Sequence, residues 1–140
     1  MGPNYYLDAS CYIYLFLEHP QHIPQVLLNL HRLNIITSTL TYDEVVWIVR
    51  KKAGKSASYD AADIVLALDQ VAMSPITKEI IARSRELMEE LDIHPRDSIH
   101  LAAAQHQSCS LIVSEDSDFD KVKGIKRIST EEFINVLLKR

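Results

Sequence analysis

Residues 4–10 read NYYLDAS, and residues 110–118 read SLIVSEDSD. In each stretch a short apolar run of strand-forming residues leads to an aspartate, Asp8 in the first and Asp116 in the second, with a serine two positions away. Ligands of α/β proteins bind in the crevice beyond the carboxyl ends of parallel strands, which is where these carboxylates would lie. The two matching junctions therefore predict a strand-and-helix fold with an acidic site at one edge of its sheet.

Apolar periodicity along the rest of the chain alternates between strand and helix, which favours a parallel sheet covered by helices over an all-helical bundle. Several of the strand candidates are short, fully apolar runs, as expected for strands that are buried on both faces. The predicted strands are residues 4–8, 35–39, 73–75, 111–114 and 125–128. The central sheet is therefore predicted to be mainly parallel.

Helix starts are marked by capping residues. The tetrad from Thr41 to Glu44 predicts a capping box that opens a helix over 45–52, and the tetrad beginning at Ser129 predicts another. Further helix starts are expected at Ser56, Thr77 and Pro95. Gly54 should end the first helix, and residues 51–58 are expected to form a mobile connection.

The bulk composition is that of one globular domain spanning residues 1–140. Apolar residues make up 47% of the chain and charged residues 24%, and the formal net charge is −4. No apolar run is long enough to cross a bilayer, so we expect a cytoplasmic protein, with Cys11 and Cys109 reduced in its core. Three glycines in total leave no glycine-rich phosphate loop, which excludes Walker and dinucleotide-binding sites.

Five acids are candidates for one site: Asp8, Glu44, Asp97, Asp116 and Asp118. Each has a simpler explanation. Asp8 could be an exposed residue at a strand end, Glu44 could complete the capping box, Asp97 could favour a helix dipole, and the last two could form an acidic turn. Unneutralised carboxylates a few ångströms apart repel by roughly 1 to 4 kcal/mol per close pair. If the acids do converge, we expect them to hold Mg²⁺ or Mn²⁺, since both ions favour oxygen ligands.

Other chemistry is poorly supported. The six histidines lack the spacing of zinc ligands, although His94 or His100 could lie near Asp97. Ser10 could orient the Asp8 carboxylate or cap the next helix. The basic cluster at residues 50–55 is either a solvated helix end or a phosphate-binding patch.

Four segments together resemble the PIN domain family, and within it the VapC-like toxins of prokaryotic toxin–antitoxin pairs. The segments read YLDAS at residues 6–10, TLTYDEV at 39–45, RDSIHLAAA at 96–104 and VSEDSDFD at 113–120. The resemblance covers nearly the whole chain. It implies a three-layer α/β/α sandwich, a ribonuclease activity that depends on Mg²⁺ or Mn²⁺, a homodimer, and neutralisation by a small antitoxin.

Residue by residue, the resemblance assigns the family's acidic quartet to Asp8, Glu44, Asp97 and Asp116. It assigns a frequent additional acid to Asp118, and the small hydroxyl positions beside the acids to Ser10 and Ser114. Asp43 directly precedes Glu44, and we assign the second acid to Glu44. The quartet would hold the metal, with Glu44 completing its shell or orienting water and Asp118 supporting a second ion. An inactive PIN-like binding module or RNA-processing subunit is the alternative, and a metal-dependent phosphatase or DNA nuclease is a third hypothesis.

Overall fold

The computed structural model describes residues 2–139 and is built around a five-stranded sheet. The strands are β1 (Asn4–Leu7), β2 (Asn34–Ser38), β3 (Val71–Ser74), β4 (Leu111–Val113) and β5 (Lys126–Ile128). Their order is β3-β2-β1-β4-β5, and every neighbouring pair is parallel. All five strands predicted from the sequence are present, with ends that differ by at most two residues.

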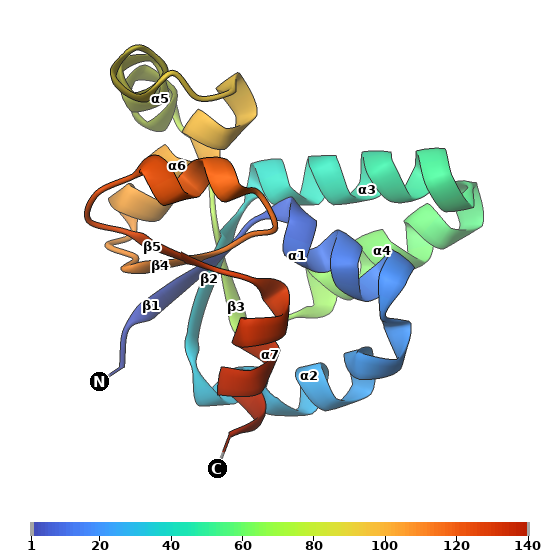
Figure 1. Ribbon diagram of the computed structural model, residues 1–140. Coiled ribbons are helices and arrows are strands. Elements are labelled where there is room, and N and C mark those ends of the chain that lie inside the picture. Colours follow the sequence, from blue (N-terminus) through green and yellow to red (C-terminus); the bar gives the residue numbers. More distant parts are fainter. Residues whose placement is uncertain (1, 140) are drawn as a thin grey trace.

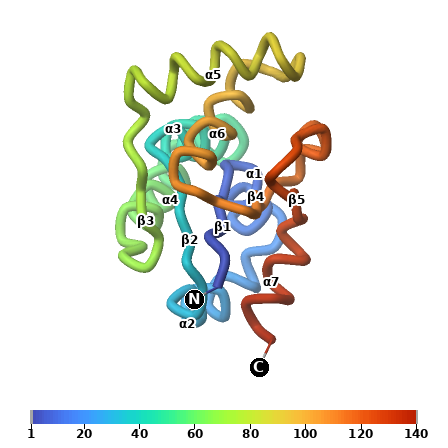
Figure 2. The backbone as a smooth tube through the Cα atoms, turned by 90° about the vertical axis from the view of Figure 1, so that its left-hand side faces the viewer, coloured from blue at the N-terminus to red at the C-terminus, as the bar shows by residue number. Residues whose placement is uncertain are grey.

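Helices connect the strands. They are α1 (Ala9–Ile13), α2 (Ile23–Asn29), α3 (Thr39–Ala53), α4 (Lys55–Ala67), α5 (Lys78–Leu91), α6 (Pro95–His106) and α7 (Thr130–Leu138). Four shorter helical segments are η1 (Tyr14–Glu18), η2 (Pro20–His22), η3 (Leu30–Arg32) and η4 (Ser117–Lys121). Figures 1 and 2 show α6 next to the sheet, with α5 lying outside it.

The sheet separates two apolar layers because successive side chains of a strand point to opposite faces. Tyr5 and Leu7 of β1 join a buried cluster with residues of α1, α2, α3, α4 and α7, whereas Tyr6 joins a second cluster with residues of α5 and α6. The three-layer α/β/α sandwich with a parallel central sheet is therefore confirmed. Cys11 and Cys109 are free and buried, one in each cluster, as expected.

The start of α3 differs from the prediction. The helix begins at Thr39 with Ser38 as its N-cap, so β2 runs directly into α3 and the predicted capping box at Thr41 is wrong. Glu44 therefore lies in the second turn, where it is too far along the helix to cap it. The simpler explanation for Glu44 is thus excluded.

The connection predicted over residues 51–58 is also wrong. These residues are helical apart from Gly54, which separates α3 from α4 with a φ of 93°, a conformation that favours glycine. Gly54 rather than Ser56 is the N-cap of α4. The other start signals are confirmed, since Thr77 caps α5, Pro95 opens α6, and Ser129 caps α7 in a capping box.

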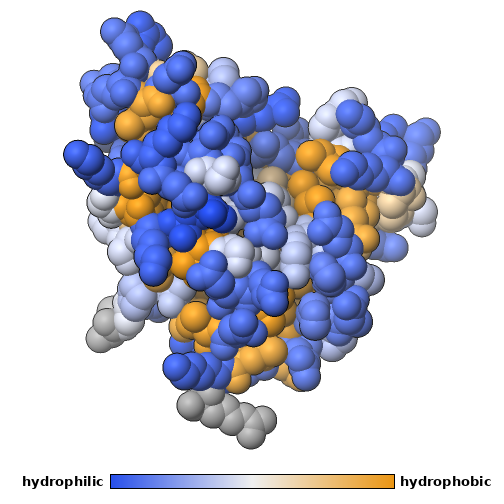
Figure 3. All heavy atoms as spheres, viewed as in Figure 1, coloured by the Kyte–Doolittle hydropathy of each residue, from blue (hydrophilic) through white to orange (hydrophobic). Residues whose placement is uncertain are grey.

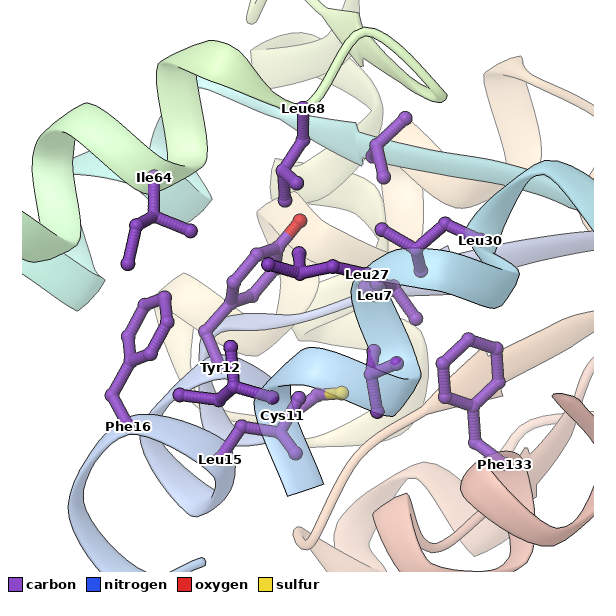
Figure 4. A pocket seen from close by; sticks show the side chains of 13 residues that line it. Leu7, Cys11, Tyr12, Leu15, Phe16, Leu27, Leu30, Ile64, Leu68 and Phe133 are labelled. Carbon is purple, nitrogen blue, oxygen red and sulfur yellow. The ribbon is translucent and has the colours of Figure 1, made fainter. Parts of the chain in front are cut away.

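The apolar hollows lie away from the acids. A small cavity of about 30 Å³ is lined by Leu7, Cys11, Tyr12 and Phe133 among other apolar side chains (Figure 4). An apolar patch on the surface covers the region of α1, α3 and α4 (Figure 3), where a shallow hollow includes Phe16 and Val49. Within residues 2–139, none of the helices combines the length and apolar character that crossing a bilayer requires.

Candidate active site

The sheet changes winding direction between β1 and β4. From β1 the chain adds β2 and β3 on one side, and later adds β4 and β5 on the other. In such sheets the crevice at the carboxyl ends of the two diverging strands is the usual ligand site. Leu7 is in register with Val113, and the backbone N–H of Asp8 donates to the Val113 carbonyl at 3.3 Å. Asp8 and the residues that follow Val113 therefore lie side by side at this crevice.

Asp8 is a buried carboxylate, with 5% of its surface exposed. It is the N-cap of α1, and its Oδ1 accepts hydrogen bonds from the backbone N–H of Ser10 at 2.9 Å and from Ser10 Oγ at 2.6 Å. Ser10 Oγ in turn accepts from the backbone N–H of Glu115 at 2.9 Å, which joins α1 to the loop after β4. Burial raises the pKa of Asp8, while the charge of His100 and the bonds from Ser10 oppose the rise. Ser10 thus orients the carboxylate, and Asp8 itself caps the helix.

The loop after β4 has its own hydrogen bonds. Ser114 Oγ accepts from the backbone N–H of Asp116 at 3.0 Å, and Asp116 Oδ1 accepts from that of Asp118 at 2.9 Å. Arg127 of β5 donates to the Ser114 carbonyl at 3.1 Å and to the carboxylate of Asp120 at 2.8 and 3.2 Å. The loop that carries Asp116 and Asp118 is therefore fixed from both sides.

Asp97 enters the crevice from the first turn of α6. It forms a group with Asp116 and Asp118 in which each residue offers a carboxylate oxygen, and these oxygens all lie within 4.8 Å of one another. Burial raises the pKa of Asp97 to about 7, with the neighbouring Asp116 and the more distant Asp8 adding to the rise. Three half-buried carboxylates at this separation suit a hard divalent cation, which would remove their mutual repulsion.

Glu44 lies beside this group without belonging to it. Its Oε1 contacts Nε2 of His100, a residue of α6 that is 2% exposed. The other ring nitrogen, Nδ1, is 2.7 Å from the hydroxyl of Tyr6, and that hydroxyl donates to Ser38 Oγ at 2.8 Å. From the sequence, His94 or His100 was expected near Asp97, and neither Tyr6 nor Ser38 was a candidate site residue. A histidine within the apolar run of residues 99–104, one turn after Asp97, was the available signal.

The structure thus brings the predicted acids to one end of the sheet in three arrangements. Asp97, Asp116 and Asp118 form a compact group, and Asp8 is linked to their loop through Ser10. Glu44 reaches His100. The individual roles of these residues in catalysis or metal binding remain predictions.

Solved structures with the same fold include toxin–antitoxin proteins. A chain of VapBC2 from Rickettsia felis, bound to a promoter DNA fragment, aligns with a TM-score of 0.72 at 19% identity over 90% of this chain and 98% of that one. VapC20 of Mycobacterium tuberculosis, a toxin that cleaves the sarcin–ricin loop, aligns with a TM-score of 0.69 at 16% identity, over 83% of this chain and 92% of that one. PAE2754 of Pyrobaculum aerophilum aligns with a TM-score of 0.73 at 18% identity over the full length of both chains.

No curated protein sequence matches the chain. At these identities the structural alignments show a shared fold, and they make the chain VapC-like in its architecture. The family model for the PIN domain matches residues 5–125, which include the four segments quoted above and every acid of the crevice. The chain therefore belongs to the PIN domain family.

Proposed function

We propose that the protein is an endoribonuclease that depends on Mg²⁺ or Mn²⁺ and acts as the toxin of a toxin–antitoxin pair. The observation that carries the proposal is the group of Asp97, Asp116 and Asp118 at the winding switch of the sheet, with Asp8 linked to the same loop. Membership of the PIN family and the fold shared with VapC proteins support a nuclease over other hydrolases.

The chemistry of the acids supports a divalent ion. All the converging donors are carboxylate oxygens, the ligands that Mg²⁺ and Mn²⁺ prefer. The pKa of Asp97 is raised because its carboxylate is partly buried beside other carboxylates, whose charge a cation would balance. Asp97 and Asp116 would hold the ion with Asp8, and Asp118 would bind at the same place or support a second ion. Ser10 and Ser114 would keep Asp8 and Asp116 oriented.

A bound divalent ion would supply a water of lowered pKa and stabilise negative charge on the phosphate. Glu44 lies at the edge of the crevice with 15% of its side chain exposed, so one of its oxygens could accept a hydrogen bond from the attacking water. Carboxylates that directly follow β1, that follow β4 in a hydrogen-bonded loop and that lie in the first turn of α6 would hold the reacting groups in place. This mechanism uses no nucleophile from a side chain.

The partners are proposed from the relatives. VapC20 cleaves the sarcin–ricin loop, and VapBC structures bound to DNA are known from R. felis and Salmonella typhimurium. We therefore assign RNA as the substrate, and as partner a small antitoxin, whose peptide could offer an arginine to the carboxylates. A homodimer, a cytoplasmic location and a single PIN domain over residues 1–140 belong to the same proposal.

The experiment is a comparison of substrates and variants. Wild type, Asp97→Asn and Asp63→Asn are incubated with single-stranded RNA, DNA of the same sequence and a simple phosphate ester, with Mn²⁺ or with EDTA. Asp63 is an exposed acid on α4 outside the acid group, so its variant controls for loss of one charge. We expect RNA cleavage by wild type and Asp63→Asn in Mn²⁺ only. Equal cleavage by Asp97→Asn, or cleavage of the other substrates alone, would refute the proposal.

A further inference from the structure

Four polar side chains from four elements form one continuous line of contacts that ends at the acid Glu44. Ser38 ends β2, Tyr6 is in β1, His100 is in α6 and Glu44 is in α3. The first three are at most 2% exposed, and the line reaches the surface only at Glu44. Consecutive members contact each other through Ser38 Oγ to Tyr6 Oη, Tyr6 Oη to His100 Nδ1, and His100 Nε2 to Glu44 Oε1.

Counting protons fixes the role of each atom. A tyrosine hydroxyl has one proton, and Tyr6 donates it to Ser38 Oγ. The Tyr6 oxygen must therefore accept from Nδ1–H of His100. The ring is thereby held with Nδ1 toward Tyr6 and Nε2 toward Glu44, and one proton is shared between Nε2 and Oε1 of Glu44. Each polar atom named here has a partner, as buried polar groups require.

We propose that His100 is a positioning residue for Glu44, with Tyr6 and Ser38 fixing the ring that holds it. The inference rests on the proposed function for its catalytic consequence. His100 Nε2 contacts one oxygen of the Glu44 carboxylate, Oε1. The other oxygen has no hydrogen-bond partner among residues 2–139 and is left to accept from water in the crevice.

Glu44 needs such a constraint because a glutamate side chain has several rotatable bonds and loses conformational entropy when it is ordered. Beyond Glu44 the surface opens into a hollow of about 140 Å³ that it shares with Asp43, Trp47 and Arg96. A free carboxylate at this position could swing into the hollow. The ring of His100 holds it at the end of the crevice, where catalysis requires a fixed group.

Burying the polar ring of His100 costs more free energy than burying an apolar side chain of similar size. A role in packing alone would therefore not explain a histidine here. His100 belongs to a helix whose other buried residues are apolar apart from Ser98, which bonds to the backbone of its own helix. Burying an imidazole there is unfavourable unless both nitrogens are satisfied. Packing against Tyr6 uses only Nδ1, whereas Nε2 is directed at Glu44, the least buried member of the line.

Two near-isosteric variants separate positioning from packing. The amide nitrogen of glutamine lies about where Nε2 of histidine lies, so His100→Gln keeps a donor for Glu44 and loses the one for Tyr6. Asparagine instead replaces Nδ1, so His100→Asn keeps the Tyr6 contact and loses Glu44. We expect kcat for RNA cleavage to fall by about 10- to 100-fold in His100→Asn and to be largely rescued in His100→Gln, with a smaller change in KM. The opposite order, or equal losses, would overturn the inference.

A double-mutant cycle tests whether His100 acts through Glu44. If it does, His100→Asn should lower the activity of wild type but cause no further loss in a Glu44→Gln background. If the two losses multiply, His100 acts independently of Glu44, and the assignment is wrong. Melting temperatures of all variants show whether a loss of activity reflects unfolding.

A measurement on the metal-free protein separates failure of this inference from failure of the proposed function. Long-range ¹H–¹⁵N NMR spectra resolve the two ring nitrogens of His100 in EDTA, without substrate. Glu44→Gln should shift the Nε2 signal, and Tyr6→Phe should shift the Nδ1 signal, while the histidine itself is unchanged in both variants. An Nε2 signal that does not move in Glu44→Gln overturns the inference even if RNA is cleaved. If it moves and RNA is not cleaved, the contact stands and the proposed function fails.

Discussion

Asp97, in the first turn of α6, and Asp116, in the loop after β4, lie so close together that Asp116 helps to raise the pKa of Asp97 to about 7. The ordinary pKa of the group is 3.8. Burial is the largest cause of the raised pKa, and repulsion from the neighbouring Asp116 carboxylate adds to it. The carboxylates of the crevice therefore repel one another unless a counter-charge is present, which is the electrostatic basis of the proposed cation site.

This relationship predicts that Asp97→Asn stabilises the metal-free protein at alkaline pH. Because the folded-state pKa of Asp97 lies above the unfolded one, the folded state holds this proton more tightly, and the contribution of Asp97 to stability falls as pH rises from about 4 to about 7. Asparagine has no such titration. In thermal unfolding with EDTA, the melting temperature of Asp97→Asn relative to that of wild type should rise as the pH increases across this range.

Asp63→Asn, at an exposed position on α4, removes one carboxylate away from the crevice and is the matched control. A difference between Asp97→Asn and wild type that stays constant with pH would contradict this explanation.

Ser10→Ala should destabilise the protein because it removes a donor from a buried carboxylate and an acceptor from Glu115. We expect a loss of about 1 to 3 kcal/mol in urea unfolding. The bond favours ionised Asp8, so its removal should raise the pKa of Asp8 further and make the loss larger at pH 8 than at pH 4. Ser56→Ala, at an exposed position in α4, should have little effect at either pH. A loss from Ser10→Ala that does not depend on pH would argue against its role as a partner of the Asp8 carboxylate.

Arg127 should affect metal binding without contacting the metal, because its guanidinium joins the Ser114 carbonyl to Asp120 and so fixes the loop of Asp116 and Asp118. Arg127→Ala is expected to weaken Mn²⁺ binding by about 10- to 100-fold in a calorimetric titration. Arg127→Lys should recover only part of the affinity, since an ammonium group cannot reproduce the planar fork. Unchanged affinity in Arg127→Ala would show that the loop is held by other contacts.

A substitution in the capping box of α7 should lower the stability of the protein without changing any of the acids. Ser129 Oγ accepts from the backbone N–H of Glu132 at 3.1 Å, and the Glu132 carboxylate accepts from the backbone N–H of Ser129 at 3.2 Å. Ser129→Ala should therefore cost about 1 kcal/mol of unfolding free energy. Its Mn²⁺-dependent rise in melting temperature should equal that of wild type. A reduced rise would mean that α7 is coupled to the acids.

Much of the fold could be predicted because its signals are local. The runs before Asp8 and Asp116 are apolar enough to identify buried strands, and Thr77, Pro95 and Ser129 carry capping preferences that their neighbours do not oppose. The start of α3 was mispredicted because the direct passage from β2 into the helix leaves no loop, while Thr41 imitates a cap. Gly54 alone turns the chain between α3 and α4, so polar residues beside it were mistaken for a loop.

The site was only partly predictable for a different reason. The acids were identified by their places at the ends of strands and the starts of helices, which local sequence shows. The contact of His100 with Glu44 joins residues 56 positions apart, and that with Tyr6 joins residues 94 apart. Such contacts depend on how α6 packs over the sheet, and no local pattern records it.

The central claim is that the acids form a divalent metal site, and the most direct test is the melting temperature of wild type and Asp97→Asn against Mn²⁺ concentration. At a hundred times its dissociation constant a ligand stabilises the folded state by about 2.7 kcal/mol, or several degrees for a domain of this size. The account predicts that wild type gains these degrees and that Asp97→Asn, the more stable protein in EDTA at pH 8, gains almost none. An equal response of both proteins, or no response of either, would contradict it.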